Sequence, residues 1–194
     1  MCYHYCMDKN IVYFTKREEW RNWLNTHFET EKEVWFTFPT VSSGEVGITY
    51  NDAVEEALCF GWIDGVAGTL DETHQLRRFT PRRKNSPYSR LNIERLIHLN
   101  EQGMIHPKLQ KSIEKVISVP FKFPKDIINA IKKDKETWNN YQAFSDSYKR
   151  IRIAYIDAAR SRPEEFKKRL NSFIKKTKEN KIITGYGGTD KYYK

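Results

Sequence analysis

Residues 49–95 constrain the fold of this chain more than any other stretch, because cap and turn residues divide them into separate elements. Thr49 is typical of a helix N-cap, and Gly61 is placed where a helix commonly ends with a left-handed residue. Between them, apolar residues recur at the spacing of a helix that buries one side. The stretch therefore predicts a helix that begins after Thr49 and ends at Gly61.

A β-hairpin and a further helix are predicted to follow. Residues 62–69 and 75–80 are rich in strand-forming residues and are joined by a polar turn. Pro81 cannot donate to a strand ladder, so it ends the second strand. After a polar loop, Ser89 is in position to cap another helix.

The N-terminal region predicts additional strands. Residues 11–14 and 34–38 read as strands, the second of which ends at a proline. A helix between them is expected to begin at Thr15, with Glu18 completing a capping box. Together with the hairpin, these elements predict a small, mostly antiparallel sheet with helices packed on one side.

The predicted secondary structure changes near residue 120. Residues 119–124 read VPFKFP, which indicates a stiff linker rather than a helix. Beyond it, the apolar spacing is helical throughout. We therefore expect an α+β core domain in residues 1–120 and a basic helical subdomain with a flexible tail in residues 121–194, so the expected fold class is α+β.

Charge is unevenly distributed along the chain. The net charge is +9, and residues 122–194 contain 19 Lys/Arg against 9 Asp/Glu, whereas residues 1–121 contain 15 against 16. Most C-terminal lysines fall at exposed helix positions, so a solvated helix face explains them without a partner. Contact of this face with nucleic acid or with anionic lipid is the alternative.

Composition argues against several classes of protein. No apolar run approaches the roughly 18 residues of a membrane span, and the first ten residues lack the features of a secretory signal. We therefore expect a cytoplasmic protein. Three cysteines do not form a disulfide framework, and Cys2, His4 and Cys6 are too close together for the usual zinc spacings. We expect neither a metal nor a cofactor.

Positive charge is concentrated after Asp64. Like charges in such a cluster favour a negatively charged partner. Ser89 would add the free N–H groups of a helix N-terminus, which favour an anion, and Trp62 and Tyr88 would offer ring faces for stacking. The six cations, with no acid between the first and the last, are Arg77, Arg78, Arg82, Arg83, Lys84 and Arg90.

These features predict a cleft that binds a small anionic or nucleotide-like ligand. Without ligand, we expect Asp64 to hydrogen-bond an arginine from residues 77–90, because either charge alone would be costly in a partly buried site. The simpler alternative is that Asp64 pairs with one arginine and the others lie in water. The predicted ligand-binding residues are Trp62, Asp64, Arg77, Arg78, Thr80, Arg82, Tyr88, Ser89, Arg90 and Asn92.

Catalysis has less support in the sequence. Asp64 is a candidate general base for a hydrolase or transferase, but it has no obvious carboxylate partner. Cys59 and His74 could form a nucleophile and base, although an apolar helix end is the usual place of an inert cysteine. No phosphate-binding loop, dinucleotide-binding fingerprint or nucleophile elbow occurs.

Two groups of motifs resemble a known family. The first comprises ITYNDAVEEALCFGWIDG, then RFTPR, then Ser89 with the run NIER; the second comprises residues 124–126, Trp138 and residues 147–150. In these motifs the chain is similar to the YdeI/OmpD-associated family, also called bacteriocin-protection proteins. The resemblance covers nearly the whole chain.

The resemblance implies a small bacterial protein linked to stress or to tolerance of antimicrobial peptides. It implies no established reaction, and a fold by itself does not determine one. We therefore expect a binding protein without catalysis; a hydrolase or transferase that uses Asp64 and a non-specific nucleic-acid-binding protein are the alternatives.

Substitution of Asp64 separates the binding and enzyme hypotheses. For a binding protein, Asp64→Asn has no turnover to abolish. For an enzyme with Asp64 as general base, the same variant keeps its affinity and loses turnover of a metabolite. Retained affinity with abolished turnover would overturn the non-enzymatic expectation.

Overall fold

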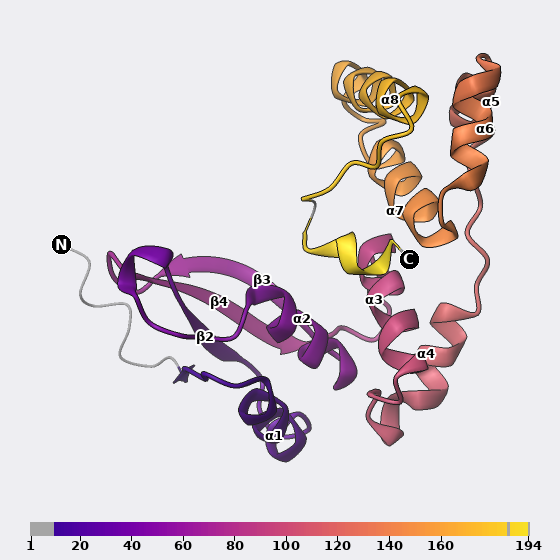
Figure 1. Ribbon diagram of the computed structural model, residues 1–194. Coiled ribbons are helices and arrows are strands. Elements are labelled where there is room, and N and C mark those ends of the chain that lie inside the picture. The colour runs from indigo at the N-terminus through magenta and orange to yellow at the C-terminus, as the bar shows by residue number, and fades with distance from the viewer. Residues whose placement is uncertain (1–9, 186, 194) are drawn as a thin grey trace. The chain divides into compact units, whose positions relative to one another are not determined.

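The computed structural model describes residues 10–185 and 187–193 and divides them into two compact units (Figure 1). The first unit takes the residues up to Pro87 together with Leu99–Ile113. The second takes Tyr88–His98 and the residues from Glu114 onward. The division near residue 120 stays a prediction about which segments fold by themselves.

The first unit contains a mixed four-stranded sheet in the order β1-β2-β4-β3. β1 runs parallel to β2, whereas β2–β4 and β3–β4 are antiparallel, so the sheet is mostly antiparallel as predicted. The hairpin formed by the last two strands is longer than predicted by one residue at each end of its second strand. The strands are β1 (Ile11–Val12), β2 (Val34–Pro39), β3 (Trp62–Thr69) and β4 (His74–Pro81).

Helices α1 (Arg17–His27) and α2 (Tyr50–Cys59) cover one face of this sheet. Trp20 of α1 is fully buried, with ring centroids 5.1 Å from Phe36 and 5.6 Å from Phe79. Its indole N–H donates to the Ala53 carbonyl of α2 at 3.0 Å. One side chain therefore joins both helices to the sheet and satisfies its own polar group.

The start of α1 differs from the prediction by one residue. The N-cap is Lys16, and Glu19 rather than Glu18 reaches back to accept the backbone N–H groups of Thr15 (3.0 Å) and Lys16 (3.1 Å). Trp20 and Leu24, four residues apart on one face of this helix, are fully buried. The predicted Thr15 cap is therefore wrong, and only the carboxylate half of the expected capping box forms, because the Lys16 side chain cannot accept a hydrogen bond.

Both ends of α2 are as predicted. The Thr49 hydroxyl accepts the Asp52 N–H at 3.1 Å and donates to the Asp52 carboxylate at 2.7 Å. Gly61 follows the helix with φ +71°, a conformation that glycine adopts without a Cβ penalty. A Cβ there would also meet Leu109 Cδ1 at 3.1 Å. Gly61 thus both ends α2 and leaves room for the segment near Pro107.

Helix α3 (Arg90–Glu101) begins after Ser89, as expected. The Ser89 hydroxyl accepts the N–H of Asn92 at 3.3 Å. A 3-10 turn at Pro107–Leu109 then leads into α4 (Gln110–Ile117). Two further 3-10 turns lie at Val41–Ser43 and Thr189–Tyr192.

The second unit is helical around its own core. Helices after the linker bury a cluster that includes Ile131, Tyr148 and Phe173. The end of the chain contacts them, since Ile183 N–H donates to the Tyr148 hydroxyl at 2.9 Å. The helices are α5 (Lys125–Lys132), α6 (Lys135–Ala143), α7 (Asp146–Asp157) and α8 (Pro163–Lys178).

This arrangement confirms the α+β class with a helical C-terminal part. In the part of the chain that the structure describes, no helix has both the length and the apolar character needed to cross a membrane.

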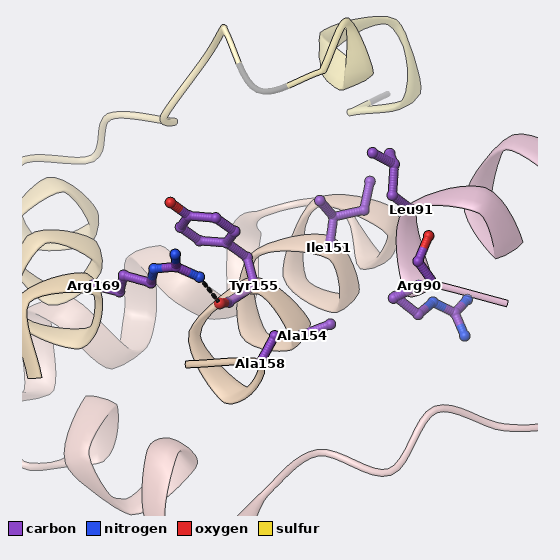
Figure 2. Close-up of a pocket in the computed structure, with 8 residues that line it drawn as sticks. Arg90, Leu91, Ile151, Ala154, Tyr155, Ala158 and Arg169 are labelled. Carbon is purple, nitrogen blue, oxygen red and sulfur yellow. Dashed lines mark hydrogen bonds between the residues drawn. The ribbon is translucent and has the colours of Figure 1, made fainter. Parts of the chain in front are cut away.

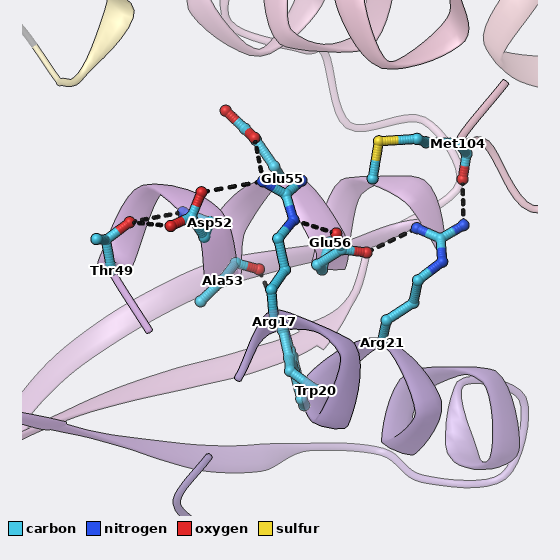
Figure 3. A network of polar contacts seen from close by, with 9 residues as sticks. All are labelled: Arg17, Trp20, Arg21, Thr49, Asp52, Ala53, Glu55, Glu56 and Met104. Carbon is cyan, nitrogen blue, oxygen red and sulfur yellow. Dashed lines mark hydrogen bonds and ion pairs between the residues drawn. The ribbon is translucent and has the colours of Figure 1, made fainter. Parts of the chain in front are cut away.

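Ion pairs between α1 and α2 enclose two buried acids (Figure 3). The Glu56 side chain is 1% exposed and accepts from Arg17 Nε and from Arg21 Nη1, the latter at 2.7 Å. Glu55, also buried, lies 3.0 Å from Arg17 Nη1, and Arg21 donates to the Met104 carbonyl at 2.6 Å. Such carboxylates are stable inside a protein only when they are paired and hydrogen-bonded.

We predict that Glu56→Ala destabilises the protein through this network. Removing one partner of a buried pair costs about 3–5 kcal/mol, and the part-exposed arginines reduce this to roughly 2 kcal/mol because water can reach them. Urea unfolding measures the change. Glu72→Ala, which removes an exposed acid from the hairpin turn, is the control and should stay within about 0.5 kcal/mol of the parent. Equal stabilities of the two variants would contradict the prediction.

Candidate functional site

The structure places Trp62 in the core of the first unit. Its side chain is 1% exposed, its indole N–H donates to the Phe28 carbonyl at 3.0 Å, and its ring meets Trp23 edge-on at 5.9 Å. The expectation that Trp62 offers a stacking face to a ligand is therefore wrong for this conformation. Burial of a large aromatic ring at a strand start outweighs its exposure in a cleft.

Asp64 hydrogen-bonds a tyrosine rather than an arginine. It accepts from the Tyr50 hydroxyl, while Arg77 lies over the Tyr50 ring at 5.1 Å and donates to the Gly65 carbonyl at 3.3 Å. A register shift lies in this part of β3, where Asp64 pairs with Phe79 and Ala67 pairs with Arg77. The expected Asp64–arginine hydrogen bond is wrong: the Tyr50 hydroxyl is the donor to Asp64, and Arg77 donates to the carbonyl of the next residue instead.

Arg78 and Thr80 lie on the other face of the sheet. Side chains alternate along β4, so Arg78 and Thr80 share a face that Arg77 does not. Arg78 forms an ion pair with Glu33, next to β2. The predicted strand residues therefore do not converge on one face.

Arg82 holds the loop that follows β4. Its guanidinium donates to the carbonyls of Ser86 at 3.0 Å and Pro87 at 3.1 Å. Arg83 and Lys84 are exposed. In this structure Arg82 therefore orders the basic loop.

Cys59 and His74 do not form a nucleophile–base pair. Cys59 is fully buried, and burial, followed by the charge of Glu56, raises the pKa of its thiol to about 12. His74 lies between Asp71 and Glu45, and its hydrogen bond with Asp71 raises its pKa. A buried, protonated thiol is a poor nucleophile.

No trio of metal-binding side chains is present among residues 10–185 and 187–193. The segment with Cys2, His4 and Cys6 lies outside the described residues.

The second unit contains a pocket of about 340 Å³ (Figure 2). It lies at the beginning of α3 and against α7 and α8, and two of the predicted ligand residues, Ser89 and Arg90, line it. The other lining residues are Leu91, Ile151, Ala154, Tyr155, Ala158 and Arg169.

One side of α7 forms the apolar part of the pocket. Ile151, Ala154, Tyr155 and Ala158 recur at the spacing of one helix face. The two alanines occupy little space, so this face is recessed between larger neighbours. The helical spacing was visible in the sequence, but the room above the alanines depends on which helices pack around them.

Arg169 of α8 is held against this face by three contacts. Its guanidinium lies 3.8 Å from the ring centroid of Tyr155, and its Nη1 donates to the Tyr155 carbonyl at 2.8 Å. Its Nε donates to Glu165 at 2.7 Å. Sequence reasoning missed both Arg169 and Tyr155, because arginine on a basic helix looks like any other solvated cation.

Arg90 is held by a buried acid. Glu94 is 3% exposed and accepts from Arg90 Nε at 2.7 Å, while Arg150 of α7 binds the same carboxylate through Nε at 2.6 Å and Nη2 at 2.8 Å. The Glu94 carboxylate in turn raises the pKa of Arg150. Two guanidinium groups share one carboxylate, which leaves this end of the pocket positively charged.

Asn92 and Tyr88 have other roles near the pocket. The Asn92 side-chain oxygen accepts from Arg95 at 2.8 Å, so the amide is used within α3. Tyr88 is part-buried just before the helix. Of the four predicted residues in the second unit, Ser89 and Arg90 are therefore the two that line the pocket.

Two protein families match the chain. Residues 12–112 match a domain of unknown function (DUF8412), and residues 120–180 match the family described as bacteriocin-protection, YdeI or OmpD-associated. The chain belongs to the DUF8412 family and carries a YdeI/OmpD-associated domain. No curated protein and no solved structure matches it.

The motifs on which the resemblance rests fall within two different family matches. Those around Gly61 and Pro81 fall within the DUF8412 match, and those around Trp138 fall within the YdeI/OmpD-associated match. The suspected YdeI/OmpD-associated family is thus confirmed through the C-terminal helices. Ile151, Tyr155 and Arg169 of the pocket lie in that domain.

We predict that Cys59 is unreactive in the folded protein. With Cys2 and Cys6 replaced by serine, a disulfide reagent at pH 8 should label no thiol, because that pH lies far below a pKa of about 12 and the sulfur is buried. In concentrated urea, one thiol per chain should react. Rapid labelling under native conditions would contradict the structure and revive the Cys59–His74 hypothesis.

Proposed function

We propose that the protein binds a small anionic ligand, without catalysis, in the pocket formed by the start of α3 and by α7 and α8. The observation that carries the proposal is the presence of two ordered arginines, Arg90 and Arg169, in one cavity. Planar guanidinium groups suit the oxygens of phosphate or carboxylate. The pocket volume of about 340 Å³ lies at the small end of the range of about 300–1,000 Å³ typical of ligand sites.

Limited exposure strengthens the attraction that these arginines exert. Their side chains are 11% and 15% exposed, so their interactions are less screened by water than those of surface cations. Ser89 at the start of α3 adds the positive end of a helix dipole. The surrounding excess of Lys/Arg over Asp/Glu in residues 122–194 further favours a negative ligand.

We propose that this binding serves a cytoplasmic bacterial stress response. The description of the matched family names bacteriocin protection, and this supports the proposal. Direct capture of cationic peptides by this chain would be opposed by its net charge of +9. Binding of an anionic metabolite is compatible with that charge.

Nucleic-acid binding is the second candidate, and one surface favours it. Lys167, Lys168 and Lys175 are exposed on α8, and within the described ranges they make no ion pair. Such binding would depend on many phosphate contacts, so its affinity would fall steeply with salt.

Catalysis by Asp64 remains the third candidate. The carboxylate accepts from Tyr50 beside Arg77, a cluster in the first unit that is separate from the proposed pocket.

We predict that Arg169→Gln weakens binding of inorganic phosphate about tenfold or more, since a hydrogen bond to a charged group contributes roughly 1.5–3 kcal/mol. Lys168→Gln, the matched control, removes the same charge from an exposed neighbouring position and should change the affinity less than twofold. Calorimetry well below the melting temperature measures both. The parent should be stabilised by about 2.7 kcal/mol at a phosphate concentration of 100 times Kd.

Two results would contradict the pocket proposal. One is the absence of phosphate binding to the parent protein. The other is an equal loss in Arg169→Gln and Lys168→Gln; if this accompanies tight, steeply salt-dependent binding of single strands, it favours the nucleic-acid candidate.

A further inference from the structure

We infer that the ligand is an amphipathic anion, with one phosphate- or carboxylate-type head and a short aliphatic body. This inference rests on the proposed function, because it concerns the chemistry of the ligand in the same pocket. It makes the general description of an anionic or nucleotide-like ligand more specific. Three observations support the inference. The pocket is charged at its ends and apolar between them, its arginines are already paired with acids, and a guanidinium group covers the ring of Tyr155.

The lining is divided into charged ends and an apolar middle. Figure 2 shows Ile151, Ala154 and Ala158 between Arg169 and Arg90. A ligand that contacts an arginine must therefore extend over aliphatic carbon. A fully hydrated ion such as phosphate would leave that surface uncovered, whereas an alkyl group would remove it from water.

The arginines of the pocket are already paired with acids, and this limits the negative charge that a bound ligand can carry. Arg169 already binds Glu165, and Arg90 shares Glu94 with Arg150. A polyphosphate would bring several charges close to these two carboxylates, and like charges at short range repel. A head with one or two charges can use the remaining guanidinium N–H groups without displacing either acid.

The ring of Tyr155 is not a ready platform for a nucleobase. The Arg169 guanidinium lies 3.8 Å from the ring centroid, and Arg152 lies 5.1 Å from it. Stacking of a base on the face that Arg169 covers would require the arginine to leave three contacts. The recess above the alanines is free of this obstacle, which favours an aliphatic body over an aromatic one.

The head-and-body arrangement also benefits from preorganisation. Arg169 and Arg90 are each fixed by hydrogen bonds before any ligand arrives. Little side-chain freedom remains to be lost on binding. A small ligand with few contacts can therefore still bind measurably.

A ligand series on the intact chain tests the inference. Calorimetry should show that butyl phosphate binds at least tenfold more tightly than inorganic phosphate, since each buried methylene adds a favourable increment. Adenosine monophosphate and adenosine triphosphate should bind more weakly than butyl phosphate. Pentanoate, compared with butyl phosphate, reports which head group is preferred, and binding of either one supports the amphipathic class.

A substitution in the apolar middle of the pocket tests where the alkyl body of the ligand lies. Ala158→Leu places a side chain over the recess without altering an arginine, and the position is exposed enough to tolerate it. It should lower the affinity for butyl phosphate to that of the parent for inorganic phosphate. Ala143→Leu, at an exposed position outside the pocket, should change neither. Ala154→Leu repeats the test if circular dichroism shows that the first variant is unfolded.

The outcomes separate this inference from the proposed function. Equal affinities of the parent for inorganic phosphate and butyl phosphate, or tighter binding of adenosine triphosphate, would overturn the amphipathic ligand and leave an anion site. Failure of every probe to bind would overturn the anion site itself. Retained butyl phosphate affinity in a folded Ala158→Leu variant would place the body elsewhere and also refute the inference.

Discussion

A single buried carboxylate holds the walls of the proposed pocket together. Glu94 is almost completely removed from water, so it needs compensating charge, and it obtains this from Arg90 on its own helix and from Arg150 on α7. The shared carboxylate ties the beginning of α3 to the helix that supplies the apolar floor. Without it, the two guanidinium groups would lie close together without a counter-charge, and their repulsion would favour separation of α3 from α7.

A second buried carboxylate is paired with two arginines in the first unit. Glu56 is buried between Arg17 and Arg21, as Glu94 is between two arginines in the second. In both places a carboxylate on one helix binds guanidinium groups that include one from another helix. Such pairs contribute specificity of packing more than net stability, because desolvation offsets much of the attraction.

The basic residues after Asp64 have different roles in the structure from the role predicted from the sequence. Arg78 pairs with Glu33, Arg82 donates to loop carbonyls and Arg90 binds Glu94. Their acceptors include groups distant in the sequence and backbone carbonyls, which a charge pattern cannot reveal. Of these arginines, only Arg90 lines the proposed pocket, together with Arg169, which the charge pattern did not indicate.

The sequence by itself determined the secondary structure, the α+β class and the family, because Thr49, Gly61, Pro81 and Ser89 act on their immediate neighbours. Even the misplaced start of α1 was an error of one residue. Only the tertiary structure decided where charges and cavities lie. Asp64 accepts from Tyr50 instead of an arginine, burial placed Trp62 in the core, and helix packing brought Arg169 onto Tyr155 in a pocket that Arg90 also lines. Such outcomes depend on contacts between segments far apart in the chain, and the spacing of residues within one segment does not reveal these contacts.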